Sequence, residues 1–178
     1  MLNRFLPQFC TLGGILFFIS QPVFPQPPDT LWTKVFQVGV AAYGYSVQQT
    51  ADEGFIVVGK SFKDFTTGFD IYLIKTDANG DTLWTRTIGD SLAQVGNCIQ
   101  QTGDSGYIIA GLTGTPAGSR NAYIVKTNSS GDTLWTTRYG GDENAEAYYV
   151  EMTSDSGYIA TGIRYVSGQG KCVSPEAL

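Results

Sequence analysis

The chain has 178 residues, of which 42% are hydrophobic and 15% are charged, and its formal net charge is −5. This length suffices for one domain with a sizeable core, although the charged fraction is low for a globular protein. The acidic balance, without any cluster of Lys and Arg, argues against binding to nucleic acid or to an anionic lipid surface.

The first 26 residues differ in composition from the rest of the chain. Arg4 is their only charged residue, and the apolar run Leu12–Ser20 has the size of the hydrophobic region of a signal peptide. The run is too short to span a bilayer, and four prolines between Pro22 and Pro28 end any helix that precedes the next segment. We therefore expect residues 1–26 to be a signal peptide. The remaining chain would be secreted, periplasmic or at the cell surface, with no membrane span after signal removal.

The next segment begins a repeat. The sequence Asp-Thr-Leu-Trp-Thr occurs three times, and its tryptophans lie 52 and then 51 residues apart. A fixed period of about 50 residues indicates an array of supersecondary units that bury their apolar faces against one another. The repeats occupy residues 27–165, in units of about 29–80, 81–131 and 132–165, and residues 166–178 form a divergent tail. The three copies of the motif are Asp29–Thr33, Asp81–Thr85 and Asp132–Thr136.

Four short β-strands are predicted in a complete unit, because runs of β-branched and aromatic residues alternate with Gly, Asp, Asn and Ser. No stretch after residue 26 has an apolar 3.6-residue period long enough for a helix. The first and second strands are predicted at Tyr45–Thr50, Asn97–Thr102 and Tyr148–Thr153, and at Phe55–Ser61, Tyr107–Thr113 and Tyr158–Arg164. The third strands are predicted at Asp70–Thr76 and Asn121–Thr127, and the fourth, which carry the tryptophans, at Thr30–Phe36, Thr82–Ile88 and Thr133–Tyr139.

The predicted turns repeat as closely as the strands. An Asp-x-Gly segment joins the first strand to the second, and Asn-Gly or Ser-Gly joins the third to the fourth. Such segments form hairpin loops with glycine at positive φ. The sequence therefore predicts an all-β fold of four-stranded antiparallel blades, as in a β-propeller, with an open stack of sheets as the alternative. The recurring structural positions are Trp32, Trp84, Trp135, Gly54, Gly106, Gly157, Gly80 and Gly131.

The segment Tyr72–Trp84, which reads YLIKTDANGDTLW, resembles the strand–turn–strand segment of bacterial β-propeller repeats. It is similar to the seven-bladed β-propeller repeat of exported bacterial proteins, and its Gly-x-x-Leu-Trp spacing is also similar to pyrroloquinoline-quinone-type propeller repeats. The resemblance covers about residues 29–165. It implies an exported propeller, often within a larger surface protein, and no ligand or catalytic set that the family shares.

The array is incomplete, since it amounts to about two and a half repeats whereas propellers close with about four to eight blades. The third unit should continue with a pattern such as Asp-x-Tyr-Leu-Ile-Lys near Lys171, but it reads KCVSPEAL from that residue. The chain is either a piece of a longer protein or pairs its edges with another chain, and the break in mid-pattern favours a piece. Open edge strands at both ends of the array predict self-association.

Three motifs resemble functional sites, but each fits a repeated strand or turn better. Gly54–Ser61 matches the phosphate-binding pattern G-x-x-x-x-G-K-[ST], yet its middle residues read as a strand and no helix follows. Gly103–Gly106 resembles the nucleophile segment of chymotrypsin-like proteases, but the chain contains no histidine to act as the base. Asp77, Asn79 and Asp81 alternate as in a calcium loop. A hairpin turn is the favoured interpretation of that third motif, with calcium as an open alternative.

Aromatic side chains and loops are the remaining candidates for binding. The tryptophans could stack on sugars, but their recurrence favours packing between blades. Cys98 and Cys172 could pair after export, or Cys98 could be a buried free thiol. Loops that vary between units are better candidates, because function often lies on loops. These loops are Lys63–Phe69, Gly114–Asn121 and the acidic segment Gly140–Glu146.

Together these observations predict a non-catalytic β-propeller segment that acts as a scaffold or binding module for an unknown protein or glycan ligand. We expect it to be part of a longer surface or secreted protein, and we predict no catalytic residue, cofactor or metal site. One alternative is a piece of an enzyme, such as a quinone-dependent dehydrogenase or a glycan-processing enzyme, whose catalytic residues lie in other blades. The other alternative is a carbohydrate-binding module.

Overall fold

The structure is a computed structural model that describes residues 32–36, 41–62 and 68–165. The chain divides into two compact units, Met1–Leu31 and Trp32–Leu178, and every described residue belongs to the second unit. The predictions that lie outside the described residues concern the signal peptide (1–26), the tail (166–178), Cys172 and residues 63–67 of the first variable loop.

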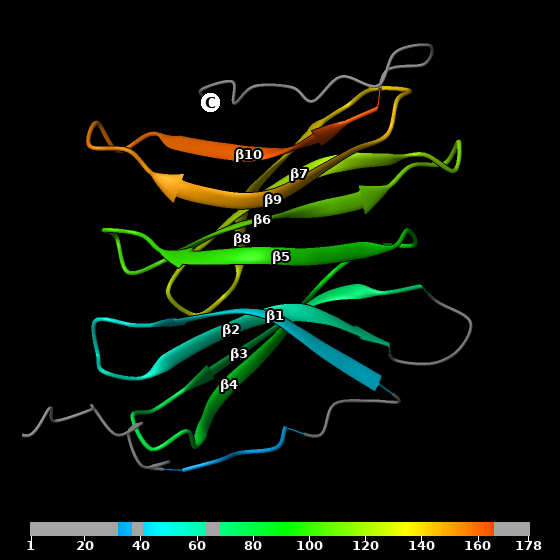
Figure 1. Cartoon of the computed structure of the whole chain (residues 1–178). Helices are drawn as coiled ribbons and strands as arrows, with labels where there is room; N and C mark the ends of the chain where they lie inside the picture. The colour runs from blue at the N-terminus through cyan, green and yellow to red at the C-terminus, as the bar shows by residue number, and fades with distance from the viewer. Residues whose placement is uncertain (1–31, 37–40, 63–67, 166–178) are drawn as a thin grey trace, which may run out of the picture. The chain divides into compact units, whose positions relative to one another are not determined.

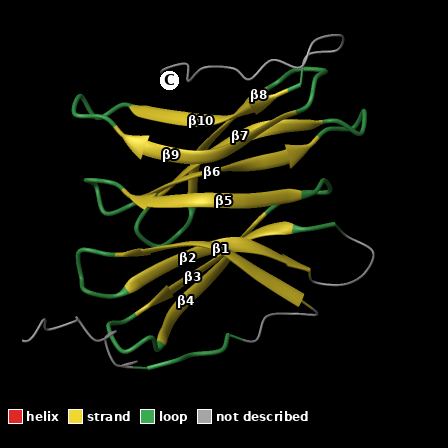
Figure 2. Ribbon diagram, in the orientation of Figure 1, coloured by secondary structure: helices red, strands yellow, loops and turns green. Residues whose placement is uncertain are grey.

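All regular structure in the described part of the chain is β-strand (Figures 1 and 2). Ten strands pair in antiparallel fashion as a first sheet with the order β1-β2-β3-β4, a second sheet with the order β5-β6-β7-β8, and a third sheet of β9 and β10. No helix in these residues has the length and hydrophobicity that crossing a membrane requires. The strands are β1 (Ala41–Gln49), β2 (Phe55–Phe62), β3 (Asp70–Thr76), β4 (Thr82–Ile88), β5 (Gln94–Gln101), β6 (Tyr107–Gly114), β7 (Arg120–Thr127), β8 (Thr133–Tyr139), β9 (Ala145–Met152) and β10 (Tyr158–Arg164).

The predicted strands agree closely with the observed ones, and the all-β prediction is confirmed. The bounds predicted for β3, β4, β8 and β10 are those observed. The prediction of a strand at Thr30–Phe36 is wrong for its described part, because Trp32–Phe36 has no strand structure. Its equivalents β4 and β8 each pair with a third strand, β3 or β7, and no described strand pairs with Trp32–Phe36 in that way.

Six hairpins share one three-residue turn. Between β1 and β2, the Thr50 carbonyl accepts a hydrogen bond from the Glu53 N–H, and the Thr50 N–H donates to the Gly54 carbonyl, both at 2.9 Å. The last loop residue has positive φ, as in a type I turn followed by a left-handed residue. The same pair of bonds closes the turns Asp77–Asp81, Thr102–Gly106, Thr115–Ser119, Asn128–Asp132 and Thr153–Gly157.

The glycines of these turns have two different roles. Gly80 and Gly131 have φ values of 78° and 80°, as the sequence predicts. The prediction is wrong for the Asp-x-Gly turns, because the positive φ lies on the residue before the glycine. A Cβ at Gly54 would collide with the Thr76 carbonyl oxygen, so this glycine makes room for the neighbouring strand. The three non-glycine residues with positive φ are Glu53 (65°), Ser105 (64°) and Ser156 (68°).

A β-bulge interrupts the first strand of every sheet at the same position. Tyr45, Asn97 and Tyr148 are the extra residues, and each bulge lies beside a glycine of the second strand. A Cβ on any of these glycines would collide with a carbonyl oxygen of the first strand. Because the ladder resumes beyond the bulge, the first strands begin three or four residues earlier than the alternation of the sequence predicts. The facing glycines are Gly59, Gly111 and Gly162.

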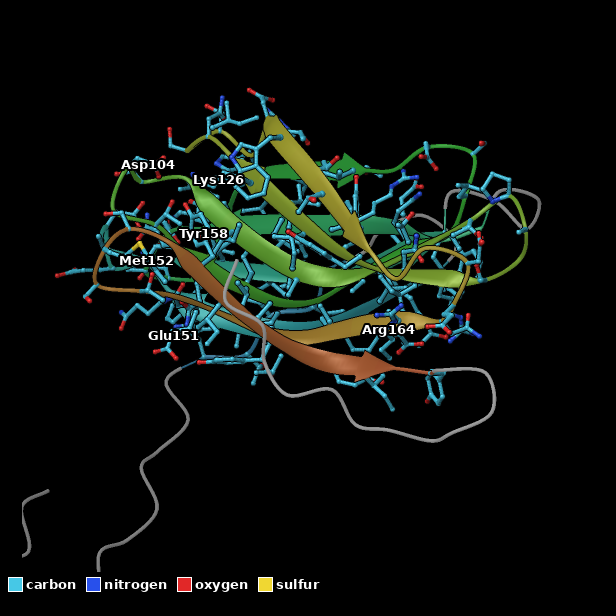
Figure 3. The ribbon with its side chains drawn as sticks, turned by 90° about the horizontal axis from the view of Figure 1, so that it is seen from above. Asp104, Lys126, Glu151, Met152, Tyr158 and Arg164 are labelled. Carbon is cyan, nitrogen blue, oxygen red and sulfur yellow. The ribbon has the colours of Figure 1, made fainter. Side chains whose placement is uncertain are left out.

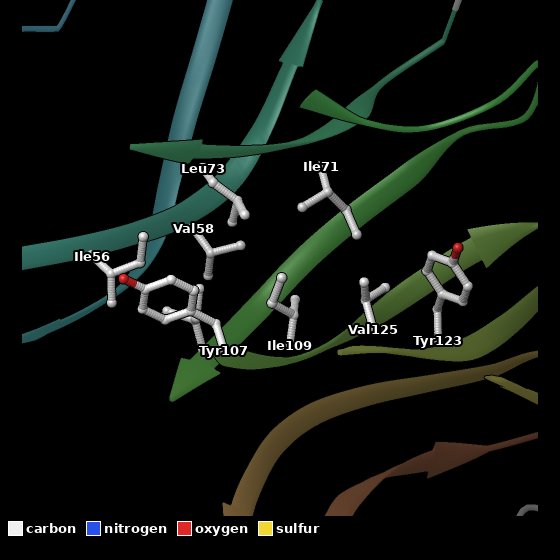
Figure 4. Close-up of a cluster of buried hydrophobic side chains, with 9 residues drawn as sticks. Ile56, Val58, Ile71, Leu73, Tyr107, Ile109, Tyr123 and Val125 are labelled. Atoms are coloured by element: carbon white, nitrogen blue, oxygen red, sulfur yellow. The ribbon is translucent and has the colours of Figure 1, made fainter. Parts of the chain in front are cut away.

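The apolar core lies between consecutive sheets. Figure 4 shows side chains of β2 and β3 facing side chains of β6 and β7 across the interface of the first and second sheets. Full burial of an aliphatic side chain contributes roughly 1.5–3 kcal/mol, so this cluster is a principal source of stability. Its buried members are Ile56, Val58, Ile71, Leu73, Ile99, Tyr107, Ile109, Tyr123 and Val125. The smaller cluster between the second and third sheets contains Cys98, Ile108, Ala110, Ile124, Ala147 and Val150.

Candidate functional site

The strands end at two edges of different character (Figure 1). At one edge, which we call the turn edge, the uniform three-residue turns join β1 to β2, β3 to β4, β5 to β6, β7 to β8 and β9 to β10. At the opposite edge, the loop edge, the connections from β4 to β5 and from β8 to β9 lie beside the ends of the second and third strands. The two edges therefore offer two kinds of candidate surface.

A buried lysine closes the first Asp-x-Gly turn of the turn edge. The Lys75 Nζ lies 2.9 Å from the Asp52 carboxylate and donates a hydrogen bond to the Thr76 carbonyl at 2.8 Å. The Lys75 side chain is only 5% exposed, whereas that of Asp52 is 58% exposed. The same carboxylate accepts hydrogen bonds from the Thr50 hydroxyl at 2.5 Å and from the Gly54 N–H at 3.2 Å. The buried ammonium is thus both paired and hydrogen-bonded, as a buried charge requires.

The second sheet repeats this arrangement. The Lys126 Nζ lies 2.9 and 3.1 Å from the two Asp104 carboxylate oxygens and donates to the Thr127 carbonyl at 2.9 Å. The Thr102 hydroxyl and the Gly106 N–H donate to Asp104 at 2.5 and 3.0 Å. A Cβ at Gly106 would lie 2.6 Å from the lysine nitrogen. The glycine therefore leaves the space that the lysine needs.

These contacts keep the turn carboxylates ionised. The hydrogen bond from Thr50, followed by that from Lys75, lowers the pKa of Asp52 from its ordinary 3.8 to about 2. The equivalent partners, with the threonine hydroxyl first, lower the pKa of Asp104 still further. Both carboxylates are therefore negatively charged across the physiological range, and their chemistry is that of turn anchors rather than of general acids.

Each tryptophan contacts the following sheet in the same way. The rings of Trp84 and Tyr107 meet edge to face with centroids 6.0 Å apart, and a Cβ at Gly131 would lie 2.8 Å from the Trp84 ring. In the same strand, Arg86 forms an ion pair with Asp132 at 3.3 Å. The contact between consecutive sheets is thus built from one residue pattern. The equivalent contacts are Trp32 with Phe55 at 5.7 Å, Lys34 with Asp81 at 2.7 Å, and Trp135 with Tyr158 at 6.1 Å.

Glutamine side chains join the first strands of consecutive sheets. The Gln48 side-chain carbonyl accepts a hydrogen bond from the Gln101 N–H at 2.6 Å, and that of Gln100 accepts one from the Met152 N–H at 3.3 Å. The two glutamines occupy equivalent positions, one before the last residue of β1 and of β5. A backbone N–H group on the first strand of each following sheet thereby donates a hydrogen bond to a side chain of the preceding sheet.

Arginines pair with two of the three acidic residues of the segment Gly140–Glu146 at the loop edge. Glu146 pairs with Arg120 at 2.9 Å, and Glu143 pairs with Arg164 at 3.0 Å. The Tyr148 hydroxyl also donates to Glu146 at 3.0 Å. These ion pairs connect the segment, which is the third variable loop, to the end of the second variable loop and to the end of β10. The charges of its two glutamates are therefore balanced by arginines from elsewhere in the chain.

Aromatic side chains gather around one lysine on β1 and β2. The Lys60 Nζ lies 3.8 Å from the centre of the Phe69 ring, 5.1 Å from that of Tyr43 and 5.7 Å from that of Tyr45. The two tyrosines are 52% and 47% exposed. Flat aromatic faces beside a hydrogen-bond donor suit stacking on a sugar ring, so this group is the candidate glycan surface of the described chain.

The motifs that resemble known sites lie in ladders and turns. Gly54–Ser61 belongs to β2 after its first residue, so its backbone pairs with β1 and β3 and does not form a phosphate cradle. Ser105 is the third residue of a hairpin turn. The Asp77 carboxylate accepts the N–H groups of Asn79 and Asp81, both at 2.9 Å, and so closes its own turn. In the described ranges, no three His, Cys, Asp or Glu side chains are grouped so as to hold a metal ion.

Cys98 is a buried free thiol in this structure. Its sulfur lies 3.9 Å from the Val150 carbonyl, within the cluster between the second and third sheets. A small apolar side chain of this kind fills space in a core.

Sequence reasoning missed the buried lysines and the bulge glycines. Both were visible as repeats, because Lys-Thr ends the third strand of each complete unit and a glycine recurs in the middle of every second strand. Their roles depend on contacts between strands, which cannot be deduced from the repeat alone.

The chain matches no protein-family model and no curated protein.

Proposed function

We propose that the chain is a segment of an exported, non-catalytic β-propeller that serves as a scaffold or binding module within a longer surface or secreted protein. The observation that carries the proposal is a repeated contact, in which a tryptophan meets an aromatic ring and a turn glycine of the sheet that follows it. Sheets that are joined by one repeated contact are related by one repeated rotation and translation, which builds a closed ring if the rotation closes and an open array if it does not. The proposal takes the closed ring of a propeller.

The distribution of polar side chains supports a non-catalytic role. The most perturbed carboxylates, Asp52 and Asp104, are occupied by lysine, threonine and glycine partners of their own turns. The chain contains no histidine, and every buried side-chain nitrogen or oxygen in the described residues has a hydrogen-bond partner. The polar groups are thus used to build the repeat.

Ring closure is the direct test of the proposal. Genes that encode about four to eight tandem copies of residues 81–131 cover the range of known propellers. We expect one copy number to give a monomeric, cooperatively unfolding protein with a closed ring in electron micrographs, because every edge would then be covered. Extended rods at all copy numbers would favour an open stack of sheets instead.

Export can be tested separately from architecture. Residues 1–31 fused to an alkaline phosphatase reporter that lacks its own leader should give periplasmic activity in a bacterial host, because the segment has the composition of a signal peptide. A fusion in which Phe17 and Phe18 are replaced by Asp is the matched control and should remain inactive. Equal activity of the two fusions would contradict export by this segment.

The second candidate function is carbohydrate binding at Tyr43, Tyr45 and Lys60, and the exposed rings of the two tyrosines favour it. A glycan array with the full chain would detect it. We expect Tyr43→Ala and Tyr45→Ala to abolish a signal that comes from this surface, whereas Tyr139→Ala, an exposed tyrosine on β8, should not. An array without signal would leave the scaffold role as the better proposal.

A further inference from the structure

One lysine departs from the charge pattern of the described chain. Seven of the eight described lysine and arginine side chains form an ion pair with a carboxylate. The buried Lys126, for example, lies beside Asp104 (Figure 3). Lys60 is the eighth, and no described carboxylate pairs with it. Its half-buried side chain lies instead against the three aromatic rings of the candidate glycan surface. A cation held beside aromatic rings in this way can take its counter-charge from a ligand.

The fold does not require a cation at the position of Lys60. In the ladder of the first sheet, Lys60 lies opposite Tyr43 on one side and opposite Ile71 on the other. The equivalent residues are Leu112 in the second sheet and Ile163 in the third. Because an aliphatic side chain suffices to build the other two sheets, the charge of Lys60 indicates a role other than folding.

The two tyrosines beside Lys60 depart from the repeat as well. Tyr43 corresponds to Val95 in the second sheet and to Glu146 in the third, and Tyr45 corresponds to Asn97 in the second. The tyrosines are 52% and 47% exposed. Among the three described sheets, the first alone therefore combines two exposed aromatic rings with a cation that lacks a described carboxylate.

The group lies at the margin of the junction between the first and second sheets. Tyr43, Lys60 and Ile71 form one cross-strand row, and the side chains of such a row lie on one face of the sheet. Ile71 belongs to the buried cluster between the first and second sheets. Both of these sheets have four strands. The exposure of the tyrosines is therefore not that of an uncovered end of the array.

We propose that Tyr43, Tyr45 and Lys60 bind a sugar ring that bears a carboxylate, as a hexuronate of an acidic glycan does. The apolar C–H groups of the sugar lie against a tyrosine, and its carboxylate accepts hydrogen bonds from the Lys60 ammonium. The Lys60 Nζ lies 5.1 and 5.7 Å from the centres of the Tyr43 and Tyr45 rings. These distances are comparable to the width of a pyranose ring, so one sugar can contact a tyrosine and the ammonium together. The inference rests on the carbohydrate-binding function considered above and specifies its sugar.

Oligosaccharides of glucuronate, galacturonate and mannuronate are suitable probes, each beside its methyl ester, which keeps the sugar and removes the charge. In calorimetry with the full chain, we expect at least one acid to bind about tenfold more tightly than its ester. Binding of that acid should weaken as salt is added, whereas binding of its ester should not. This comparison uses the original chain, so it does not depend on the folding of any variant.

The repeat itself supplies variants that suit the fold. Lys60→Leu places the residue of the second sheet at this position, so it should keep the melting temperature while the affinity for the acid falls to that for the ester. Lys60→Arg retains the charge and should retain the preference. Tyr43→Val, also the residue of the second sheet, should weaken binding of acid and ester alike. Arg86→Thr is the matched charge control and should bind normally, because it removes a cation from β4 at the position that Thr137 holds in β8.

Equal affinity for acid and ester, or a preference for the acid that Lys60→Leu retains, would overturn the inference. Carbohydrate binding at this surface would still stand if Tyr43→Val abolished the signal. Failure of every acid and every ester to bind would overturn the inference and the carbohydrate-binding function together. Ring closure of the tandem repeats tests the propeller independently, because residues 81–131 contain none of the three side chains.

Discussion

In the two four-stranded sheets, the ammonium groups of the buried lysines are the charges that are most costly to withdraw from water. Each ammonium is withdrawn from water, yet its carboxylate partner stays more than half exposed. If the carboxylate is removed, the buried lysine retains only a backbone carbonyl as its hydrogen-bond acceptor. The loss of stability therefore comes mainly from the unpaired lysine and not from the exposed aspartate. Replacing the aspartate is therefore the substitution that reveals the cost of burying the lysine.

We expect Asp104→Asn to lower the free energy of unfolding by about 1–3 kcal/mol, because it leaves the Lys126 ammonium buried without its counter-charge. Urea denaturation of the full chain measures the change. Asp155→Asn is the matched control, since it alters the same turn where no described lysine pairs with the aspartate, and its effect should be smaller. Equal losses would show that the turn, and not the ion pair, is what Asp104 stabilises.

The lowered pKa values predict a loss of stability in acid. Unfolded aspartate titrates near pH 3.9, whereas the pKa of Asp52 is about 2 in the folded chain, and that of Asp104 is lowered still further. As the pH falls below about 4, the unfolded chain takes up protons that the folded chain excludes, so unfolding becomes more favourable. The contribution is fully present above the unfolded pKa and disappears as the pH falls through the folded pKa.

The measurement is the melting temperature between about pH 6 and about pH 2. A chain with both Asp52→Asn and Asp104→Asn should have a lower melting temperature at neutral pH and a flatter decline in acid than the original chain. A parallel decline in the two proteins would assign the acid sensitivity to other carboxylates.

At the scale of the strands, the β-bulge is the feature that places the strictest requirement on the sequence, because the residue facing it must be glycine. Each bulge brings a carbonyl oxygen of the first strand against the Cα of the facing glycine. Gly111→Ala should therefore destabilise the chain by about 2–4 kcal/mol, since backbone and not a flexible side chain would have to move. Gly103→Ala is the matched control, because no atom lies within 4 Å of the added Cβ, and it should change stability by less than about 0.5 kcal/mol. Circular dichroism melts of the two variants provide the comparison.

The strands themselves were largely predictable from the sequence. Alternating β-branched and aromatic residues with Gly and Asp boundaries predicted β3, β4, β8 and β10 to the residue. Positions that depend on a facing strand were not predictable in this way. Gly54 looked like a residue chosen for positive φ, but its role is to leave space for Lys75 and Thr76, which lie about twenty residues further along the chain.

The surroundings of the variable loops were not predictable from the sequence for the same reason. Segment Gly140–Glu146 reads as an acidic surface, because its glutamates stand close together and no cation lies within it. The arginines that pair with the two glutamates come from β7 and β10, so only the fold reveals them. Charge in a single segment therefore predicts a binding surface poorly when strands from elsewhere in the chain end beside it.

At the scale of the whole described array, the tryptophans should contribute unequally to stability. We expect Trp84→Ala to cost about 2–4 kcal/mol, because its ring is packed between Tyr107 and Gly131 at the interface of two complete sheets. Trp135→Ala should cost less, since that residue is 41% exposed beside the two-stranded sheet. Chemical denaturation of both variants tests the order, and a greater loss for Trp135 would contradict it.

The glutamine contacts between first strands have a consequence for how such a protein grows and changes. The side chains of Gln48 and Gln100 each contact the first strand of the following sheet, so these contacts connect consecutive sheets. A newly synthesised sheet can therefore dock on the completed sheet that precedes it, without waiting for distant parts of the chain. Duplication or loss of one whole unit would preserve every such contact, whereas an insertion of a few residues within a strand would disrupt both neighbours. The stretch of 51 or 52 residues between tryptophans is thus the natural increment by which this protein lengthens or shortens.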